Sequence, residues 1–140
     1  MKRVVDVALC CKGKMLLCLE EVSHCPGELY WIPPGGKVEP NESDEAAILR
    51  ELNEELGITV VMLVKCGVAL RPYRVHQGDW FGDQMVVQHF VAELNVLLPF
   101  ELRVGQLDAC WASTPPAGGL VFPFTEALMT SLRLDGYLHQ

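Results

Sequence analysis

The sequence GKVEPNESDEAAILRELNEELGI, residues 36–58, decides the fold of this chain. Its second half predicts a helix, because Ile48, Leu49, Leu52 and Leu56 form an apolar stripe at helical spacing. Asparagine and serine residues suited to an N-terminal cap stand before the stripe, and a glycine suited to a C-terminal cap follows it. The stretch therefore predicts a glycine-rich loop followed by a helix that ends at about residue 56.

The ends of this helix can be placed more closely. Asn41 or Ser43 can act as the N-terminal cap, and both are open from the sequence alone. Asp44 and Glu45 would then lie in the first turn, where the helix dipole favours negative charge. Gly57 has the conformational freedom that a C-terminal cap requires.

The predicted helix carries a cluster of acid side chains. Glu51, Glu54 and Glu55 are spaced at i, i+3 and i+4, so they share one helix face. Three carboxylates so close repel one another, and a divalent cation relieves that repulsion because hard cations prefer oxygen ligands. Arg50 can pair with a carboxylate through two hydrogen bonds. A solvated acidic surface on a structural protein is the alternative, but it leaves the glycine-rich loop at Gly36 unexplained.

The order of these residues resembles the signature of the Nudix hydrolase family at each of its defined positions. Those positions are Gly36, Glu42, Arg50-Glu51-Leu52, Glu54-Glu55 and Gly57-Ile58. The resemblance implies the Nudix fold, in which a mixed β-sheet is sandwiched between helices. The fold class expected is therefore α+β, with mixed α/β layers, in one domain over residues 1–140.

The same resemblance implies a metal-dependent enzyme. It assigns Mg²⁺ or Mn²⁺ to Glu51, Glu54 and Glu55, with a backbone carbonyl near Gly36 available to the metal. The catalytic set that it implies is these three glutamates together with Arg50, which would orient one of them. The reaction implied is attack of water on one phosphorus of a diphosphate, with a carboxylate accepting the proton.

The carboxylate that acts as base is less directly indicated. Many relatives carry a glutamate five or six residues before a tryptophan in a later loop. The tryptophan here is Trp111, and those two positions hold Gln106 and Gly105. We therefore favour a glutamate of the helix, Glu51 first. The resemblance also implies that Glu42 supports the loop through a charged contact.

Substrate contacts are expected outside the signature. Arg71, Tyr73 and Arg74 form a cationic and aromatic group in an acidic protein, and such residues stack on bases or pair with phosphate. Trp80 is a candidate lining residue of a base pocket. The alternatives are an ordinary exposed loop for the first three, and packing in the core or a dimer contact for Trp80.

The end of the chain suggests the substrate class. Cys110-Trp111 and Phe122-Pro123-Phe124 resemble the small Nudix members that hydrolyse nucleoside triphosphates, including oxidised ones. The favoured reaction therefore gives a nucleoside monophosphate and pyrophosphate. The alternatives are ADP-ribose, a nucleotide sugar or a dinucleoside polyphosphate as substrate. A catalytically silent module that binds a nucleotide is the alternative from another functional class.

The bulk properties limit the partners. A net charge of -7 argues against a nucleic-acid-binding protein, and no apolar run is long enough to span a membrane. The six cysteines form no C-x-x-C pair, which argues against a zinc site and favours a reducing, cytoplasmic location. The expected partner is a small nucleotide, and a homodimer is open because dimers are common in the family.

Hydrophobic patterning predicts the remaining elements. Strands are expected over 4–11, 15–19, 29–32, 58–64, 67–70, 85–94 and 109–112, a loop over 71–83, and a closing helix over 124–132.

Overall fold

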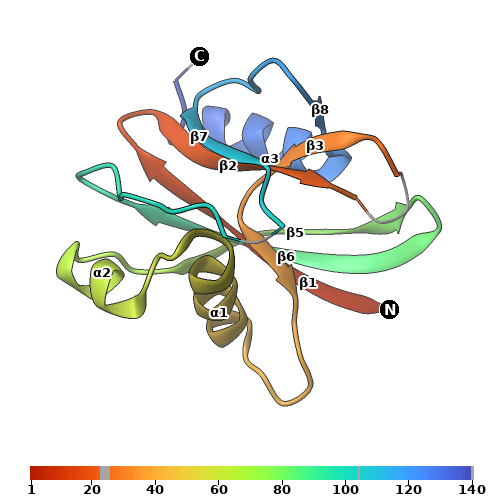
Figure 1. The fold of residues 1–140 in the computed structure, drawn as a ribbon, viewed down its shortest axis with the longest axis horizontal. Helices are drawn as coiled ribbons and strands as arrows, with labels where there is room; N and C mark the ends of the chain where they lie inside the picture. The colour runs from red at the N-terminus through yellow and green to blue at the C-terminus, as the bar shows by residue number, and fades with distance from the viewer. Residues whose placement is uncertain (23–25, 104, 140) are drawn as a thin grey trace.

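The computed structural model describes residues 1–22, 26–103 and 105–139, which form a strand-rich α+β fold (Figure 1). The strands are β1 (Lys2–Cys11), β2 (Lys14–Glu21), β3 (Leu29–Ile32), β4 (Gly35–Lys37), β5 (Arg71–Trp80), β6 (Asp83–Glu93), β7 (Asp108–Ala112) and β8 (Leu120–Val121). The helices are α1 (Asp44–Leu56), α2 (Val60–Lys65) and α3 (Pro123–Leu134). The predicted fold class is confirmed, as are the two N-terminal strands, the signature helix and the closing helix.

The strands form one curled, mixed sheet. Its order is β5-β6-β1-β2-β3-β8, with β4 paired to β1 and β7 paired to β2. β1 runs antiparallel to β2 and parallel to β6. The pairing with β6 places Asp6 opposite His89. The short strand β4 pairs with the first half of β1, so Gly36 lies opposite Val5. This pairing holds the glycine-rich loop against the sheet beside α1.

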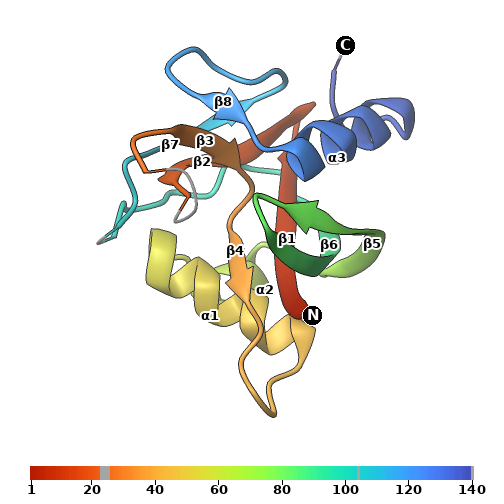
Figure 2. The ribbon, with the colours of Figure 1, turned by 90° about the vertical axis from the view of Figure 1, so that its right-hand side faces the viewer.

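Helices cover both faces of the sheet. α1 and α2 lie on one face and α3 lies on the other (Figure 1 and Figure 2). Leu52 and Leu56 of α1 pack in one apolar cluster with β1, β2 and β6, and Leu128 and Leu132 of α3 pack in a second cluster. The expected sandwich of a sheet between helices is thereby confirmed. Over the described part of the chain, no helix has the length and apolar character needed to cross a membrane.

The caps of α1 resolve the choice that the sequence left open. Ser43 is the N-terminal cap, because its hydroxyl accepts a hydrogen bond from the Ala46 N–H at 3.1 Å. Asn41 instead lies in the preceding turn with a φ of 64°. Gly57 takes the left-handed conformation at a φ of 65°, and its N–H donates to the Asn53 carbonyl. The helix is thus fixed at both ends by its own sequence.

The strands predicted over 58–64 and 67–70 were wrong. Val60–Lys65 forms helix α2, and 67–70 belongs to no strand. Thr59 starts the helix, because its hydroxyl accepts a hydrogen bond from the Met62 N–H at 3.3 Å. This cap outweighs the preference of the valines for strands, and Leu63 provides the apolar anchor of the turn.

The loop predicted over 71–83 was also wrong, because Arg71–Trp80 forms β5 and pairs antiparallel with β6. β5 lies at the edge of the sheet, and most of its residues are exposed or half-exposed. An edge strand of this kind lacks the alternation of apolar and polar residues that identifies a half-buried strand. Its partner strand, not its own pattern, places it in the sheet.

The structure describes five of the six cysteines. Cys10, Cys11 and Cys18 are buried, and no disulfide joins any of the five cysteines in the described ranges. Cys25 lies outside those ranges.

Candidate active site

The glycine-rich loop lies directly on helix α1. A Cβ added at Gly36 would stand 2.4 Å from the Glu51 Oε1 atom, and one at Gly35 would stand 2.1 Å from the Val5 carbonyl oxygen. Both distances are far shorter than a real carbon contact. Glycine is therefore required at Gly35 by the backbone of the neighbouring strand, whereas at Gly36 a larger side chain would displace the Glu51 carboxylate.

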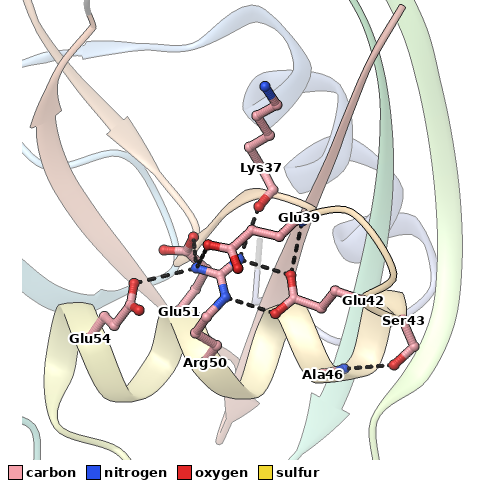
Figure 3. Close-up of polar contacts among 8 residues, drawn as sticks. All are labelled: Lys37, Glu39, Glu42, Ser43, Ala46, Arg50, Glu51 and Glu54. Atoms are coloured by element: carbon pink, nitrogen blue, oxygen red, sulfur yellow. Dashed lines mark hydrogen bonds and ion pairs between the residues drawn. The ribbon is translucent and has the colours of Figure 1, made fainter.

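Arg50 ties this loop to the helix (Figure 3). Its Nε donates to Glu42 Oε2 at 2.8 Å and its Nη2 donates to Glu42 Oε1 at 2.9 Å. Nη2 also donates to the Lys37 carbonyl at 3.0 Å, and Nη1 donates to Glu51 Oε1 at 2.9 Å and to Glu54 Oε2 at 3.3 Å. One guanidinium thus holds the loop and two helix carboxylates together.

These contacts shift the pKa values of both partners. The hydrogen bonds from Arg50, with a smaller contribution from the Glu39 N–H, lower the pKa of Glu42 to about 2. The hydrogen bond to Glu42 and the pairing with Glu51 raise the pKa of the Arg50 guanidinium above its already high ordinary value. Both groups therefore stay charged throughout the range in which an enzyme works.

Glu55 is the most buried acid of the helix. Its side chain is 8% exposed, and its Oε2 atom has no hydrogen-bond partner. Burial, then the charge of Glu20, then a hydrogen bond and charge from Glu51 raise the pKa of Glu55 to about 10, against a weaker hydrogen bond from the Gly35 backbone. A carboxylate with an unsatisfied oxygen in such surroundings is suited to receive a cation.

Glu20, a carboxylate from outside the signature, was not predicted as a site residue from the sequence. It lies near the end of β2, and the Gln106 Nε2 donates a hydrogen bond to its Oε1 at 2.7 Å. Burial raises the pKa of Glu20, the Gln106 hydrogen bond opposes this, and the charge of Glu51 adds to the rise. Gln106 occupies one of the two positions at which many relatives carry a glutamate. In this chain the acid beside that position is Glu20, which comes from β2.

One signal in the sequence could have found Glu20. Leu16 and Cys18 belong to the apolar cluster that α1 covers, and Glu20 follows them at the same spacing of two residues. An acid that continues the inward-facing row of a strand is unusual, and it points to a charged partner or a ligand.

The donor set fits a hard divalent cation. Glu51, Glu54 and Glu55 offer only oxygen atoms, and the orphaned Glu55 Oε2 needs a positive partner. As the side chains stand, no three acid, histidine or cysteine side chains in the described ranges converge on one point. Glu51 and Glu54 are turned toward Arg50, so ligation would require them to share that contact with the metal.

The predicted substrate residues fall into two groups. Arg71, Tyr73 and Arg74 lie on β5 and contact the C-terminal end of α3 and the turn after it. The Tyr73 hydroxyl donates to Asp135, Arg74 Nη2 pairs with the same carboxylate at 3.3 Å, and Arg71 Nη2 donates to the Tyr137 hydroxyl at 2.8 Å. These three residues are brought together, on the face of the sheet opposite α1.

Trp80 lies apart from them, at the other end of β5. Its ring packs against Phe124 in a T-shaped contact at 5.4 Å and against Phe122 at 6.4 Å. A cavity of about 540 Å³ lies beside this aromatic group, between α3, β8 and the tip of the β5–β6 hairpin. Its lining residues are Tyr30, Phe81, Pro115, Leu120, Val121, Pro123, Glu126, Met129, Thr130 and Arg133.

Known proteins resemble this chain in sequence. Residues 1–120 match the model of the NUDIX domain. The chain is 58% identical over 38 residues to the 8-oxo-dGTP diphosphatase of Proteus vulgaris, covering 27% of this chain and 32% of that protein. It is 50% identical over 46 residues to the CTP pyrophosphohydrolase of Escherichia coli, covering 33% of each. The matches thus span about a third of the length of these two relatives.

Solved structures share the fold. The E. coli dihydroneopterin triphosphate pyrophosphohydrolase superposes with a TM-score of 0.75 at 17% identity, covering 96% of both chains. A MutT NUDIX hydrolase from Burkholderia pseudomallei superposes with a TM-score of 0.67 at 18% identity, covering 92% of this chain and 95% of the other. The sequence match, the shared fold and the arrangement of α1 and its loop agree: the chain belongs to the Nudix family.

Proposed function

We propose that this chain is a metal-dependent pyrophosphohydrolase acting on a nucleoside diphosphate linked to another group. The favoured substrate is a nucleoside triphosphate, canonical or oxidised, which gives a nucleoside monophosphate and pyrophosphate. One observation carries the proposal: the buried Glu55, with an unpartnered oxygen, stands beside Glu51 at a loop that Arg50 holds in place. A protein that used this helix only as a surface would have no reason to bury an acid there.

The relatives support the substrate class. The Proteus vulgaris protein is named for 8-oxo-dGTP and the E. coli protein for CTP, and both are nucleoside triphosphates. A solved structure that shares the fold is named for Ap4A, a dinucleoside polyphosphate, so the alternatives within the enzyme class belong in the test.

The metal site of the proposal uses Glu51, Glu54 and Glu55, with a backbone carbonyl near Gly36. Mg²⁺ or Mn²⁺ bound there would neutralise phosphate charge and lower the pKa of the attacking water. Arg50 fixes the direction of the Glu51 carboxylate through the 2.9 Å hydrogen bond. Glu51 accepts the proton of the water that attacks phosphorus.

The nucleoside is proposed to bind on the side of the cavity next to Trp80. Tyr30 lines this cavity. Tyr30 is paired across the sheet with Glu20 of β2, so the wall of the cavity adjoins the strand that carries this acid. Aromatic and apolar walls with a few polar groups are typical of a base pocket. Arg71, Tyr73 and Arg74 stay candidate substrate contacts at the far end of β5.

The test is a panel of substrates with Mg²⁺ or Mn²⁺ and identification of the products. The panel holds canonical and oxidised nucleoside triphosphates, ADP-ribose, nucleotide sugars and dinucleoside polyphosphates. Equal amounts of monophosphate and pyrophosphate from a triphosphate, abolished by a chelator, are the expected result. Turnover of only one of the other compound classes would replace the nucleoside triphosphate as the proposed substrate. Nucleotide binding without turnover of any compound would overturn the proposed activity and favour the catalytically silent binding module.

A further inference from the structure

Glu20 lies on the sheet face that helix α1 covers. Leu16 and Cys18 precede it on β2 at alternate positions, and both pack in the same apolar cluster as Leu52 and Leu56 of α1. Alternate residues of a strand point to one face, so the side chain of Glu20 continues this row. The row thus ends in an acid at the border of the helix.

The position of Glu20 is held from a second direction. The Gln106 Nε2 donates to Glu20 Oε1 at 2.7 Å, and the neighbouring Leu107 N–H donates to the Leu19 carbonyl at 3.3 Å. The segment that carries Gln106 is therefore bonded to the same end of β2. An amide that fixes one carboxylate oxygen sets the direction of the other.

Glu20 faces the acids of α1. Leu52 and Leu56 of α1 pack in one cluster with Leu16 and Cys18, the residues that precede Glu20 in its row on β2. Glu55 lies between these two leucines in the helix sequence, is 8% exposed, and has a buried Oε2 atom without a hydrogen-bond partner. Carboxylates that share a poorly solvated region repel one another unless a cation joins them, although the side chains of Glu20, Glu51 and Glu55 do not yet converge on one point in this structure.

We propose that Glu20 is a further metal ligand, which approaches the cation of Glu51 and Glu55 from the sheet side. The inference rests on the proposed function, because it takes the site to be a divalent cation site. Helix α1 supplies oxygen atoms from one side only, whereas Mg²⁺ and Mn²⁺ are surrounded by ligands. A ligand from β2 would couple the strand to the helix through the metal.

Direct measurement of Mn²⁺ binding to the free protein tests this proposal, by titration calorimetry or by the loss of the free-ion electron paramagnetic resonance signal. Glu20→Gln keeps the shape of the side chain and its hydrogen-bonding reach toward Gln106 but removes the charge. We expect it to weaken Mn²⁺ binding on the order of 10-fold or more. The matched control is Glu21→Gln, the exposed neighbour on the opposite face of β2, which should bind as the wild type does.

Two further variants separate the possible failures. Gln106→Ala leaves the Glu20 charge but releases its orientation, so an intermediate loss of Mn²⁺ affinity is expected. Glu55→Gln reports on the proposed function itself and should lose binding. If Glu55→Gln loses Mn²⁺ and Glu20→Gln binds like the wild type, the role of Glu20 is overturned and the metal site stands. If the wild type binds no Mn²⁺, both proposals fail. Thermal melts without metal confirm that each variant is folded.

Discussion

Arg50 and Glu42 form a two-point ion pair, with Nε to Oε2 at 2.8 Å and Nη2 to Oε1 at 2.9 Å. The pair joins the middle of α1 to the turn that precedes it, across eight residues of sequence. Because the same guanidinium also holds Glu51, the loop and the proposed base are positioned by one side chain. The geometry of the site therefore depends on the planar fork of an arginine.

Arg50→Lys should lower kcat because an ammonium group cannot reproduce the fork. A reduction on the order of 10-fold to 100-fold is expected. The change in Tm should be small, since lysine keeps the positive charge beside Glu42. Steady-state kinetics with a triphosphate substrate measure the reduction in kcat. Arg3→Lys, whose arginine pairs with Asp44 at the start of the helix, is the control and should leave kcat unchanged. An Arg50→Lys enzyme as active as that control would contradict the positioning role.

The two glycines of the loop should respond differently to alanine. A Cβ at Gly35 meets the fixed backbone of Val5 and Asp6, so Gly35→Ala should lower Tm. A Cβ at Gly36 meets the Glu51 carboxylate, which can rotate away, so Gly36→Ala should keep most of the stability and lose most of the turnover. Melting curves and kcat for both variants check this. Equal losses of stability and activity in the two variants would refute the distinction.

The metal-free protein should lose stability as pH rises, because of Glu55. Its pKa is raised from 4.5 in the reference state to about 10 in the folded protein, so the folded state binds more protons across that window. Stability falls with pH wherever the folded state binds more protons. Glu55→Gln should therefore melt at a higher temperature than the wild type at about pH 9 in a chelator, and this gain should vanish at about pH 4. A rise in melting temperature that is the same at both pH values would contradict the raised pKa of Glu55.

A chain of polar side chains that runs from the buried Asp6 and His89 to the half-exposed His76 gives a second pH dependence. Asp6 Oδ1 bonds His89 Nδ1 at 2.5 Å, and His89 Nε2 bonds His76 Nδ1 at 2.7 Å. Burial, with a smaller effect from His89, lowers the pKa of His76 below 6.5. The unfolded chain then binds the proton first, so stability should fall as pH drops below about 6.5. Urea unfolding measures the free energy of unfolding at about pH 7 and pH 5. Its decrease between these pH values should be smaller for His76→Asn than for the wild type. An equal decrease in the two proteins would contradict the role of His76.

Local patterns in the sequence were sufficient for α1 and its loop. Apolar spacing, Ser43 and Gly57 are all within the stretch that forms the helix, so its limits could be predicted. Helix α2 was missed because its valines favour strands, whereas a single hydroxyl at Thr59 sets the helix start. Strand β5 was missed because its residues do not alternate between apolar and polar types, as those of a half-buried strand do.

The parts of the site that the sequence did not predict depend on contacts between distant segments. Glu20 and Gln106 are separated by 86 residues and meet because β7, which begins just after Gln106, pairs with β2 in the sheet. The separation of Trp80 from Arg71, Tyr73 and Arg74 likewise follows from β5 being extended: a loop could have gathered all four residues, whereas a strand places them at its two ends.

The most direct test of the account is the rate of nucleoside triphosphate hydrolysis by the wild type, by Glu55→Gln and by Glu101→Gln, each with saturating Mg²⁺ and again with excess chelator. Glu101 is an exposed acid outside the helix and serves as the control. The account predicts that the wild type and Glu101→Gln release pyrophosphate at equal rates only with the metal, and that Glu55→Gln is at least about 100-fold slower. Metal-dependent turnover by Glu55→Gln at the wild-type rate would show that the carboxylate cluster of α1 is not the catalytic site.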